Sequence, residues 1–233
     1  MNYYIKKKKR KSLIGRIKFS VVAWLIIINI IASIIGFFLF ALSEDYINYI
    51  ALKPENILQG KFLWTLITHM FVHGGIGHLL INMFVLFSLG GLCEKIIGRK
   101  RFLWFYILSG LFAGILSVLL AGFFGLTDLG QRIFGSPDIF MVGASGAIFA
   151  IAGLYVVLLP RLKFMIIFLP FFSLPAYVMV PLVLFIMWGV SILFNWPIGN
   201  VAHFGGFLAG IIYGSYLRTR YRKKVQRLQG RFR

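Results

Sequence analysis

Six long apolar segments constrain the fold of this chain more than any other feature of the sequence. They cover about residues 19–42, 67–92, 102–124, 144–159, 177–194 and 201–217. A helix that crosses a bilayer needs about 20 mostly apolar residues. These segments are continuously apolar and do not alternate every second residue, as the strands of a membrane barrel do. The sequence therefore predicts an all-α membrane protein in which residues 19–217 form one domain of six transmembrane helices.

The basic residues lie between and beyond the apolar segments, and their positions predict the topology. Of the 25 Lys and Arg residues, 22 fall in residues 1–18, 93–101, 161–163 and 218–233. Because short basic segments stay on the cytoplasmic side, we expect both termini there, as a basic N-terminal segment 1–18 and a basic tail 218–233. The net charge of +19 then indicates contact with anionic lipids of the inner leaflet and not with nucleic acid.

Polar and ionisable side chains inside these segments are the candidates for function, because such groups are costly in lipid. The second segment contains His69, His73, His78 and Asn82, and His203 stands near the start of the sixth. Asn82 follows His78 by four residues, which places the two on one helix face. We expect His69 and His73 to have structural roles, with His73 pairing or capping near the outer loop.

Three of the polar residues are predicted to lie at one depth. Ser145, His203 and Asn82 stand 16, 15 and 13 residues before the basic residue that ends their respective segments. At about 1.5 Å per helical residue, they lie about 20–24 Å from that boundary. Because the three segments run in the same direction, the side chains share one layer below the outer surface.

Small residues indicate which of these segments pack closely. Gly206 and Gly210 repeat at four-residue spacing in the sixth segment, and Gly146 begins a similar ridge in the fourth. Such ridges let two helix backbones approach, which predicts hydrogen-bonding distance between Ser145 and His203. A neutral imidazole beside a serine hydroxyl forms a nucleophile–base pair. The residues expected to pack around this pair are Gly143, Gly146, Phe149, Gly206 and Gly210.

The residue types exclude several other reaction mechanisms. None of the six acidic residues lies in the interior of an apolar segment, which excludes an intramembrane aspartyl protease and a complete Ser-His-Asp triad. A zinc protease of the His-Glu-x-x-His type needs a glutamate between its histidines, so we expect no metal and no cofactor. A dyad of Ser145 and His203 remains, with His78, Asn82 and the Ser145 backbone N–H available to stabilise an oxyanion.

Each of these residues also has an ordinary explanation when taken alone. A serine among small residues usually packs against another helix, Asn82 can form an interhelical hydrogen bond, and His203 can be a buried histidine with satisfied hydrogen bonds. The combination of residue types, depth and small-residue ridges favours a site over these separate explanations.

Four motifs together resemble the rhomboid family of intramembrane serine proteases. They are "HGGIGHLLINM" at 73–83, "GGLCEKIIG" at 90–98, "GASG" at 143–146 and "AHFGGFLAG" at 202–210. Their order and spacing match the family over most of the chain, from about Phe62 to Gly214. The arrangement is similar to the six-span prokaryotic form, which implies an integral, multi-pass protein of a prokaryotic plasma membrane.

The resemblance implies a function and a role for each site residue. Ser145 would be the nucleophile, His203 the general base and then the general acid, and His78 with Asn82 would contribute to the oxyanion site. The expected reaction is hydrolysis of peptide bonds in or near transmembrane segments of other membrane proteins. Two positions depart from the pattern of many relatives: Thr65 replaces the arginine of a Trp-Arg pair, and Phe149 replaces a tyrosine.

Two other classes of protein stay open on sequence grounds. A rhomboid-like protein can bind membrane clients without cleaving them, although such proteins usually lack the serine or the histidine that this chain has at 145 and 203. A six-span transporter would need polar residues along its whole path, whereas the polar residues here lie at one depth.

Overall fold

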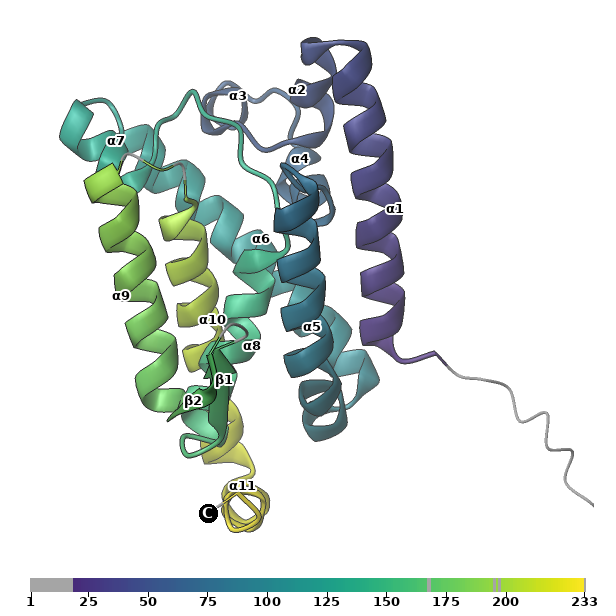
Figure 1. The fold of residues 1–233 in the computed structure, drawn as a ribbon, viewed down its shortest axis with the longest axis vertical. Helices are drawn as coiled ribbons and strands as arrows, with labels where there is room; N and C mark the ends of the chain where they lie inside the picture. The colour runs from purple at the N-terminus through teal and green to yellow at the C-terminus, as the bar shows by residue number, and fades with distance from the viewer. Residues whose placement is uncertain (1–18, 167–168, 195, 197, 233) are drawn as a thin grey trace, which may run out of the picture.

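The computed structural model describes residues 19–166, 169–194, 196 and 198–232, and these residues form a helical bundle with one β-hairpin (Figure 1). In chain order the elements are α1 (Val21–Leu42), η1 (Glu44–Tyr46), α2 (Ile47–Ile50), α3 (Pro54–Leu58), α4 (Thr65–Thr68), η2 (His69–Phe71), α5 (Ile76–Ile97), α6 (Arg99–Phe124), α7 (Asp128–Phe134), α8 (Ser145–Leu158), β1 (Lys163–Ile166), β2 (Leu169–Pro175), α9 (Ala176–Phe194), α10 (Asn200–Arg220) and α11 (Arg222–Gln229).

Helices α1, α5, α6, α8, α9 and α10 occupy the six apolar segments. Four of them, α1, α5, α6 and α9, are long and apolar enough to cross a membrane. Helix α8 is apolar but has only 14 residues. Helix α10 has 21 residues, and two arginines stand in its last turn. The helical membrane architecture is therefore present, with one short helix at the centre of the bundle.

The surface and the interior of the bundle have the reverse polarity of a soluble protein. Large apolar side chains point outward, for example Ile34, Phe87 and Phe185, which are 59%, 71% and 76% exposed. Polar side chains are buried, among them Asn29 and Ser33. An outer surface of this kind fits lipid as the surrounding medium.

The two ends of the bundle differ in structure and charge. The short helices α2, α3, α4 and α7 gather at one end, here called the loop end, at the top of Figure 1. The β-hairpin, α11 and the C-terminus lie at the opposite end, here called the basic end. Five of the six acidic residues belong to the segments of the loop end: Glu44, Asp45, Glu55, Asp128 and Asp138. The sixth, Glu94, lies at the basic end.

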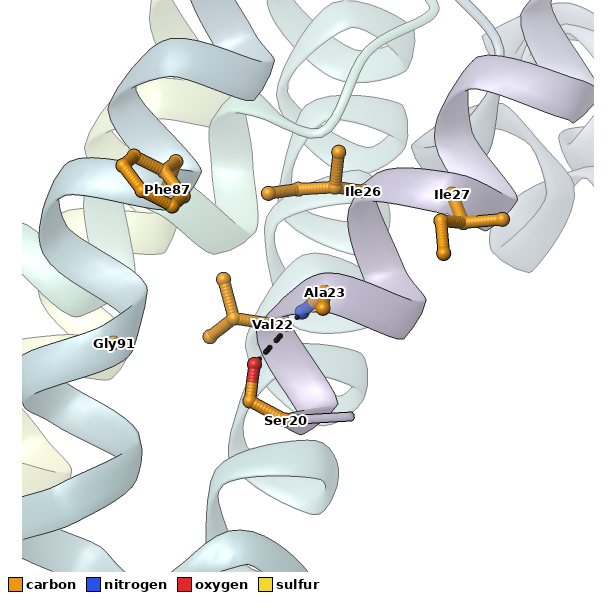
Figure 2. A pocket seen from close by; sticks show the side chains of 7 residues that line it. All are labelled: Ser20, Val22, Ala23, Ile26, Ile27, Phe87 and Gly91. Carbon is orange, nitrogen blue, oxygen red and sulfur yellow. Dashed lines mark hydrogen bonds between the residues drawn. The ribbon is translucent and has the colours of Figure 1, made fainter. Parts of the chain in front are cut away.

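Glu94 joins the start of α1 to the end of α5. Its buried carboxylate accepts a hydrogen bond of 3.1 Å from the backbone N–H of Val22 and pairs with Arg99 at 3.4 Å. A β-carbon at Gly90 would lie 2.8 Å from the Val22 side chain, so the two helices touch there. Beside this contact is a shallow apolar groove of about 260 Å³, lined by residues of both helices (Figure 2).

The closest helix contact in the described structure joins α8 and α10. A β-carbon on Gly210 would overlap the carbonyl oxygen of Ala150, and one on Gly153 would overlap that of Phe207. Glycine at these positions lets the two backbones meet. This contact sets the distance between the side chains at the starts of the two helices.

The structure departs from the expected elements in three places. Helix α5 begins at Ile76, not near residue 67, because Gly74 and Gly75 interrupt the segment, so His69 and His73 precede the helix. Residues 163–166 and 169–175 form two antiparallel strands that pair Phe164 with Leu174. The basic tail contains the helix α11. The basic segment 1–18 lies outside the described residues.

Candidate functional site

Ser145 and His203 form a hydrogen bond at the centre of the bundle. Ser145 Oγ lies 2.8 Å from His203 Nε2, although the residues are 58 positions apart in the sequence. Ser145 is the first residue of α8, and His203 belongs to the first turn of α10. The sequence predicted this proximity, and the structure has it. When Nδ1 carries the ring proton, Nε2 can accept the serine proton.

The segment before α8 carries Ser145 from the loop end into the bundle. Met141 exchanges two backbone hydrogen bonds with Leu52, at 2.7 and 3.0 Å. Two residues later, the N–H of Gly143 donates to the carbonyl of His69 at 2.8 Å. These bonds fix the chain below the loop helices, so α8 starts within the bundle (Figure 1).

Gly143 lets the ring of His78 approach the serine. Its φ of +124° lies in a region that favours glycine. A β-carbon at Gly143 would lie 2.8 Å from His78 Cε1 and 3.9 Å from Ser145 Oγ. His78 and Ser145 therefore flank one small space next to this glycine.

The ring of His203 is positioned by packing. Phe149, one helical turn after Ser145, lies against it with ring centres 4.7 Å apart and planes at 30°. His203 Nδ1 is buried and has no hydrogen-bond partner among the described residues. The buried Oδ1 of Asn200, three residues earlier on α10, also has none there. In the described structure, no carboxylate orients the imidazole.

Ser33 on α1 supports the site through a contact with His73, and residue spacing does not indicate this contact. Ser33 Oγ lies 2.9 Å from His73 Nδ1, across 40 positions of sequence. The ring of His73 packs edge-on against His78 with centres 5.0 Å apart. His73 therefore helps to position His78. His69 has a separate contact, since its Nδ1 lies 2.8 Å from the carbonyl oxygen of Thr65. Asn200 was also missed, although its spacing of three from His203 was visible.

Asn82 lies on the same helix as His78 but is turned toward its own backbone. Its Nδ2 donates to the carbonyl of His78 at 3.0 Å, and the side chain is buried. Within the described residues, no hydrogen bond joins Asn82 or His78 to Ser145. The first backbone N–H groups of α8 have no acceptor within the helix, and they begin at Ser145. These groups and the neighbouring ring of His78 are the donors available around the serine hydroxyl.

The chemistry available at this site is that of a nucleophile and a base. Among the described residues, no three His, Cys, Asp or Glu side chains gather in a way that could hold a metal ion. Positive partial charge at the start of α8 favours negative charge that develops there. The arrangement suits attack on a carbonyl followed by stabilisation of an oxyanion.

Comparison with known proteins identifies the family. The Rhomboid domain model matches residues 61–220. The chain is 34% identical over 171 residues to RHOMBOID-like protein 5 of Arabidopsis thaliana, an alignment that covers 73% of this chain and 48% of that protein.

Two bacterial relatives are named as proteases. The chain is 29% identical over 181 residues to the rhomboid protease GlpG of Haemophilus influenzae, which covers 77% of this chain and 82% of GlpG. It is 28% identical over 177 residues to the rhomboid protease GluP of Bacillus subtilis, covering 75% of this chain and 30% of GluP. The match to the domain model includes Ser145, His203 and both helices that carry them, and the chain belongs to the rhomboid family.

Proposed function

We propose that this protein is an intramembrane serine endopeptidase that uses Ser145 and His203 as a catalytic dyad. The observation that carries the proposal is the 2.8 Å contact between Ser145 Oγ and His203 Nε2, deep in a bundle with an apolar outer surface. Its membership of a family with members named as proteases supports the same activity. The substrates would be membrane proteins cleaved in or near a transmembrane segment.

The first half of the reaction forms an acyl-enzyme. Ser145 Oγ attacks the carbonyl carbon of the scissile bond while His203 Nε2 takes the hydroxyl proton. The carbonyl oxygen becomes an oxyanion beside the start of α8, where the Ser145 N–H and the His78 ring are the nearest candidate donors. His203 then gives its proton to the leaving amine as the peptide C–N bond breaks. The N-terminal part of the substrate stays on Ser145 as an ester.

Water completes the reaction in the second half. His203 takes a proton from a water molecule, whose oxygen attacks the ester carbon. The second oxyanion collapses as the bond to Ser145 Oγ breaks, and the serine recovers its proton. The water enters from the loop end, toward which the exposed His78 lies.

The topology in the membrane is a further part of the proposal. Six helices span the bilayer, including the short α8 and the arginine-ended α10. The basic end faces the cytoplasm, so both termini lie there. A transmembrane substrate must unfold locally before its carbonyls become accessible, because helical carbonyls are already hydrogen-bonded in lipid. Plasma-membrane location in a prokaryote fits the bacterial relatives.

The test is cleavage of a model single-span substrate by purified protein in lipid vesicles. Ser145→Ala and His203→Ala should each abolish both cleavage and labelling by a fluorophosphonate, because the reagent reacts with a serine that its base activates. Ser117→Ala is the matched control, because Ser117 is also buried but bonds only the carbonyl of Ala113. Full cleavage by Ser145→Ala would refute the mechanism. Substrate binding without cleavage by the wild type would favour a client-binding protein, and solute flux without labelling would favour a transporter.

A further inference from the structure

A second groove runs along the outer surface between α6 and α10, on the half of the bundle that reaches the basic end. It has a volume of about 560 Å³ and is lined almost entirely by apolar and aromatic side chains. Trp104, Leu108 and Ile212 form its rim and are 56%, 55% and 63% exposed. The groove in Figure 2 is smaller and its lining holds no charged residue. The groove between α6 and α10 differs because Arg101 closes its basic end.

The floor of this groove is built from stacked rings. Phe105 lies against Tyr213 with ring centres 5.0 Å apart and planes at 28°, and Tyr213 stacks on Tyr216 at 6.2 Å. Phe105 is buried, so this floor is held by the packing of the bundle. Binding in a preformed apolar groove costs little conformational entropy, because the side chains that line the groove are already ordered.

The length of the groove matches half of a bilayer. Its lining on α6 extends from Arg101 to Phe112, which are 11 residues apart. This distance corresponds to about 16 Å of helix. A hydrocarbon core about 30 Å thick gives about 15 Å for one leaflet. One acyl chain of a lipid in the leaflet at the basic end would therefore fit along the groove.

Two cations stand at the end of the groove where the headgroup of that lipid would lie. The Arg101 guanidinium is 3.5 Å from the Tyr221 hydroxyl and 5.7 Å from the centre of its ring. Lys224 Nζ lies 5.7 Å from the same ring centre. The ion pairs found in the described part of the chain use neither cation. The only acidic residue of the basic end, Glu94, is engaged by Val22 and Arg99.

The orientation of α11 keeps Lys224 at this level. Helix α11 is seen end-on in Figure 1, so it lies across the bundle axis, as a helix on a membrane surface would. Val225 is buried, whereas Lys224 is exposed. Arginine forms paired hydrogen bonds to phosphate oxygens, and lysine adds a mobile positive charge.

We propose that the groove between α6 and α10 binds one anionic phospholipid, with an acyl chain on the aromatic floor and its phosphate held by Arg101 and Lys224. The site lies at the end of the bundle away from Ser145, and binding there does not depend on the proposed hydrolysis. The occupant is a bilayer lipid and not free phosphate, because the apolar channel contributes most of the contact area.

Native mass spectrometry of the full chain, stripped of lipid in detergent, tests the proposal by titration with phosphatidylglycerol. The wild type should retain one lipid, and Arg101→Gln with Lys224→Gln should weaken this binding at least tenfold. Arg222→Gln with Lys223→Gln removes the same amount of positive charge, both residues being on α11, and should change the lipid affinity less than twofold. Ala209→Leu, which places a larger side chain in the groove, should also weaken binding. Thermal unfolding checks that each variant is folded.

Three results would overturn the proposal. Equal weakening by the two double variants would mean that the basic end attracts lipid only through its overall charge. Equally tight binding of phosphatidylcholine with the same acyl chains would exclude recognition of the headgroup charge. Competition by soluble glycerol phosphate at a concentration equal to that of the lipid would mean that the phosphate, and not the chain, supplies the affinity.

Discussion

Gly206 of α10 and Gly146 of α8 are in direct backbone contact, because a β-carbon on Gly206 would overlap the carbonyl oxygen of Gly146. Gly146 is itself enclosed, since a β-carbon there would lie 2.9 Å from that of Ala113 on α6. This contact lies one residue beyond Ser145 and one helical turn beyond His203. The distance between hydroxyl and imidazole therefore depends on two residues that have no side chains.

Gly206→Ala should separate α8 from α10 and destabilise the protein. Overpacking of this kind costs about 1–3 kcal/mol. The added carbon overlaps the Gly146 carbonyl oxygen, so the two helices must move apart until the 2.8 Å contact between Ser145 and His203 exceeds the range of a hydrogen bond. We expect a lower unfolding temperature and loss of fluorophosphonate labelling. Gly189→Ala in α9 is the control, because a β-carbon there meets no atom within 4 Å. Similar losses in both variants would show that any alanine in a helix is harmful, and would contradict the role of the contact.

Phe149→Ala should lower kcat while KM changes little. The ring of Phe149 packs on His203, and an aromatic pair contributes about 0.5–1.5 kcal/mol, which corresponds to a loss of up to about tenfold. Phe149→Tyr keeps the ring and should retain most of the activity. Steady-state cleavage of a model substrate measures both constants. A rise in KM with unchanged kcat would assign Phe149 to substrate binding.

Glu94→Ala should destabilise the contact between α1 and α5. The buried N–H of Val22 would lose its acceptor, which costs about 1–3 kcal/mol. Arg99→Gln removes the cation of the ion pair and the hydrogen bond from Arg99 to the carbonyl of Phe19, and the Arg99 side chain is 49% exposed. A half-exposed pair contributes about 0–1 kcal/mol, so this variant should unfold close to the wild type. Thermal unfolding in one detergent compares the two variants. Equal losses of unfolding temperature would mean that Glu94 stabilises the protein through its ion pair with Arg99 and not through its bond to the start of α1.

The loop end should loosen in acid through Lys53 and Glu55. The hydrogen bond and charge of Lys53 lower the pKa of Glu55, and the hydrogen bond that Lys53 donates to Glu55 raises the pKa of Lys53. A lowered carboxyl pKa stabilises the folded loop above the ordinary value of 4.5, and this contribution is lost as the pH falls through the lowered pKa. The raised pKa of Lys53 stabilises below its ordinary value and is lost only at strongly alkaline pH.

Amide exchange of residues 51–58 measures this effect. Exchange relative to the intrinsic rate should increase between pH 5 and pH 3, an interval that brackets the 4.5 of the free carboxyl. Glu55→Gln should be insensitive over the same range. Asp138 also lies near Lys53, at 3.7 Å, so Asp138→Asn serves as the comparison. If Glu55→Gln kept the acid response and Asp138→Asn lost it, the pair would be Lys53 with Asp138.

The helices and the contact between Ser145 and His203 could be predicted because lipid imposes simple rules on sequence. Apolar length marked the segments, and polar residues at one depth marked Ser145 and His203. The early part of the second segment could not be assigned in this way, because residues 67–72 are apolar without belonging to α5. Gly74 and Gly75 end the local structure before α5, although the hydropathy of the segment continues across them.

Contacts between distant segments were not accessible to the same reasoning. The bond between Ser33 and His73 depends on how α1 packs against the rest of the bundle. The position of a serine within an apolar helix does not indicate which distant residue it will contact. Asn82 was predicted to share a helix face with His78, but its bond to the carbonyl of His78 could not be inferred from the sequence. The strands at 163–166 and 169–175 were not predicted, since a short apolar run does not distinguish strand from helix.

The short length of the central helix α8 has a geometric consequence. Helix α8 has 14 residues, about 21 Å of rise, within a hydrocarbon layer of about 30 Å. In the proposed topology, Ser145 at the start of α8 therefore lies below the outer boundary of that layer by about a third of its thickness, and the number of turns in this helix sets the depth of the hydroxyl. Adding one turn to α8 below Ser145 and one to α10 below His203 would raise both side chains together by about 5 Å and move the proposed cleavage along the substrate by a similar distance.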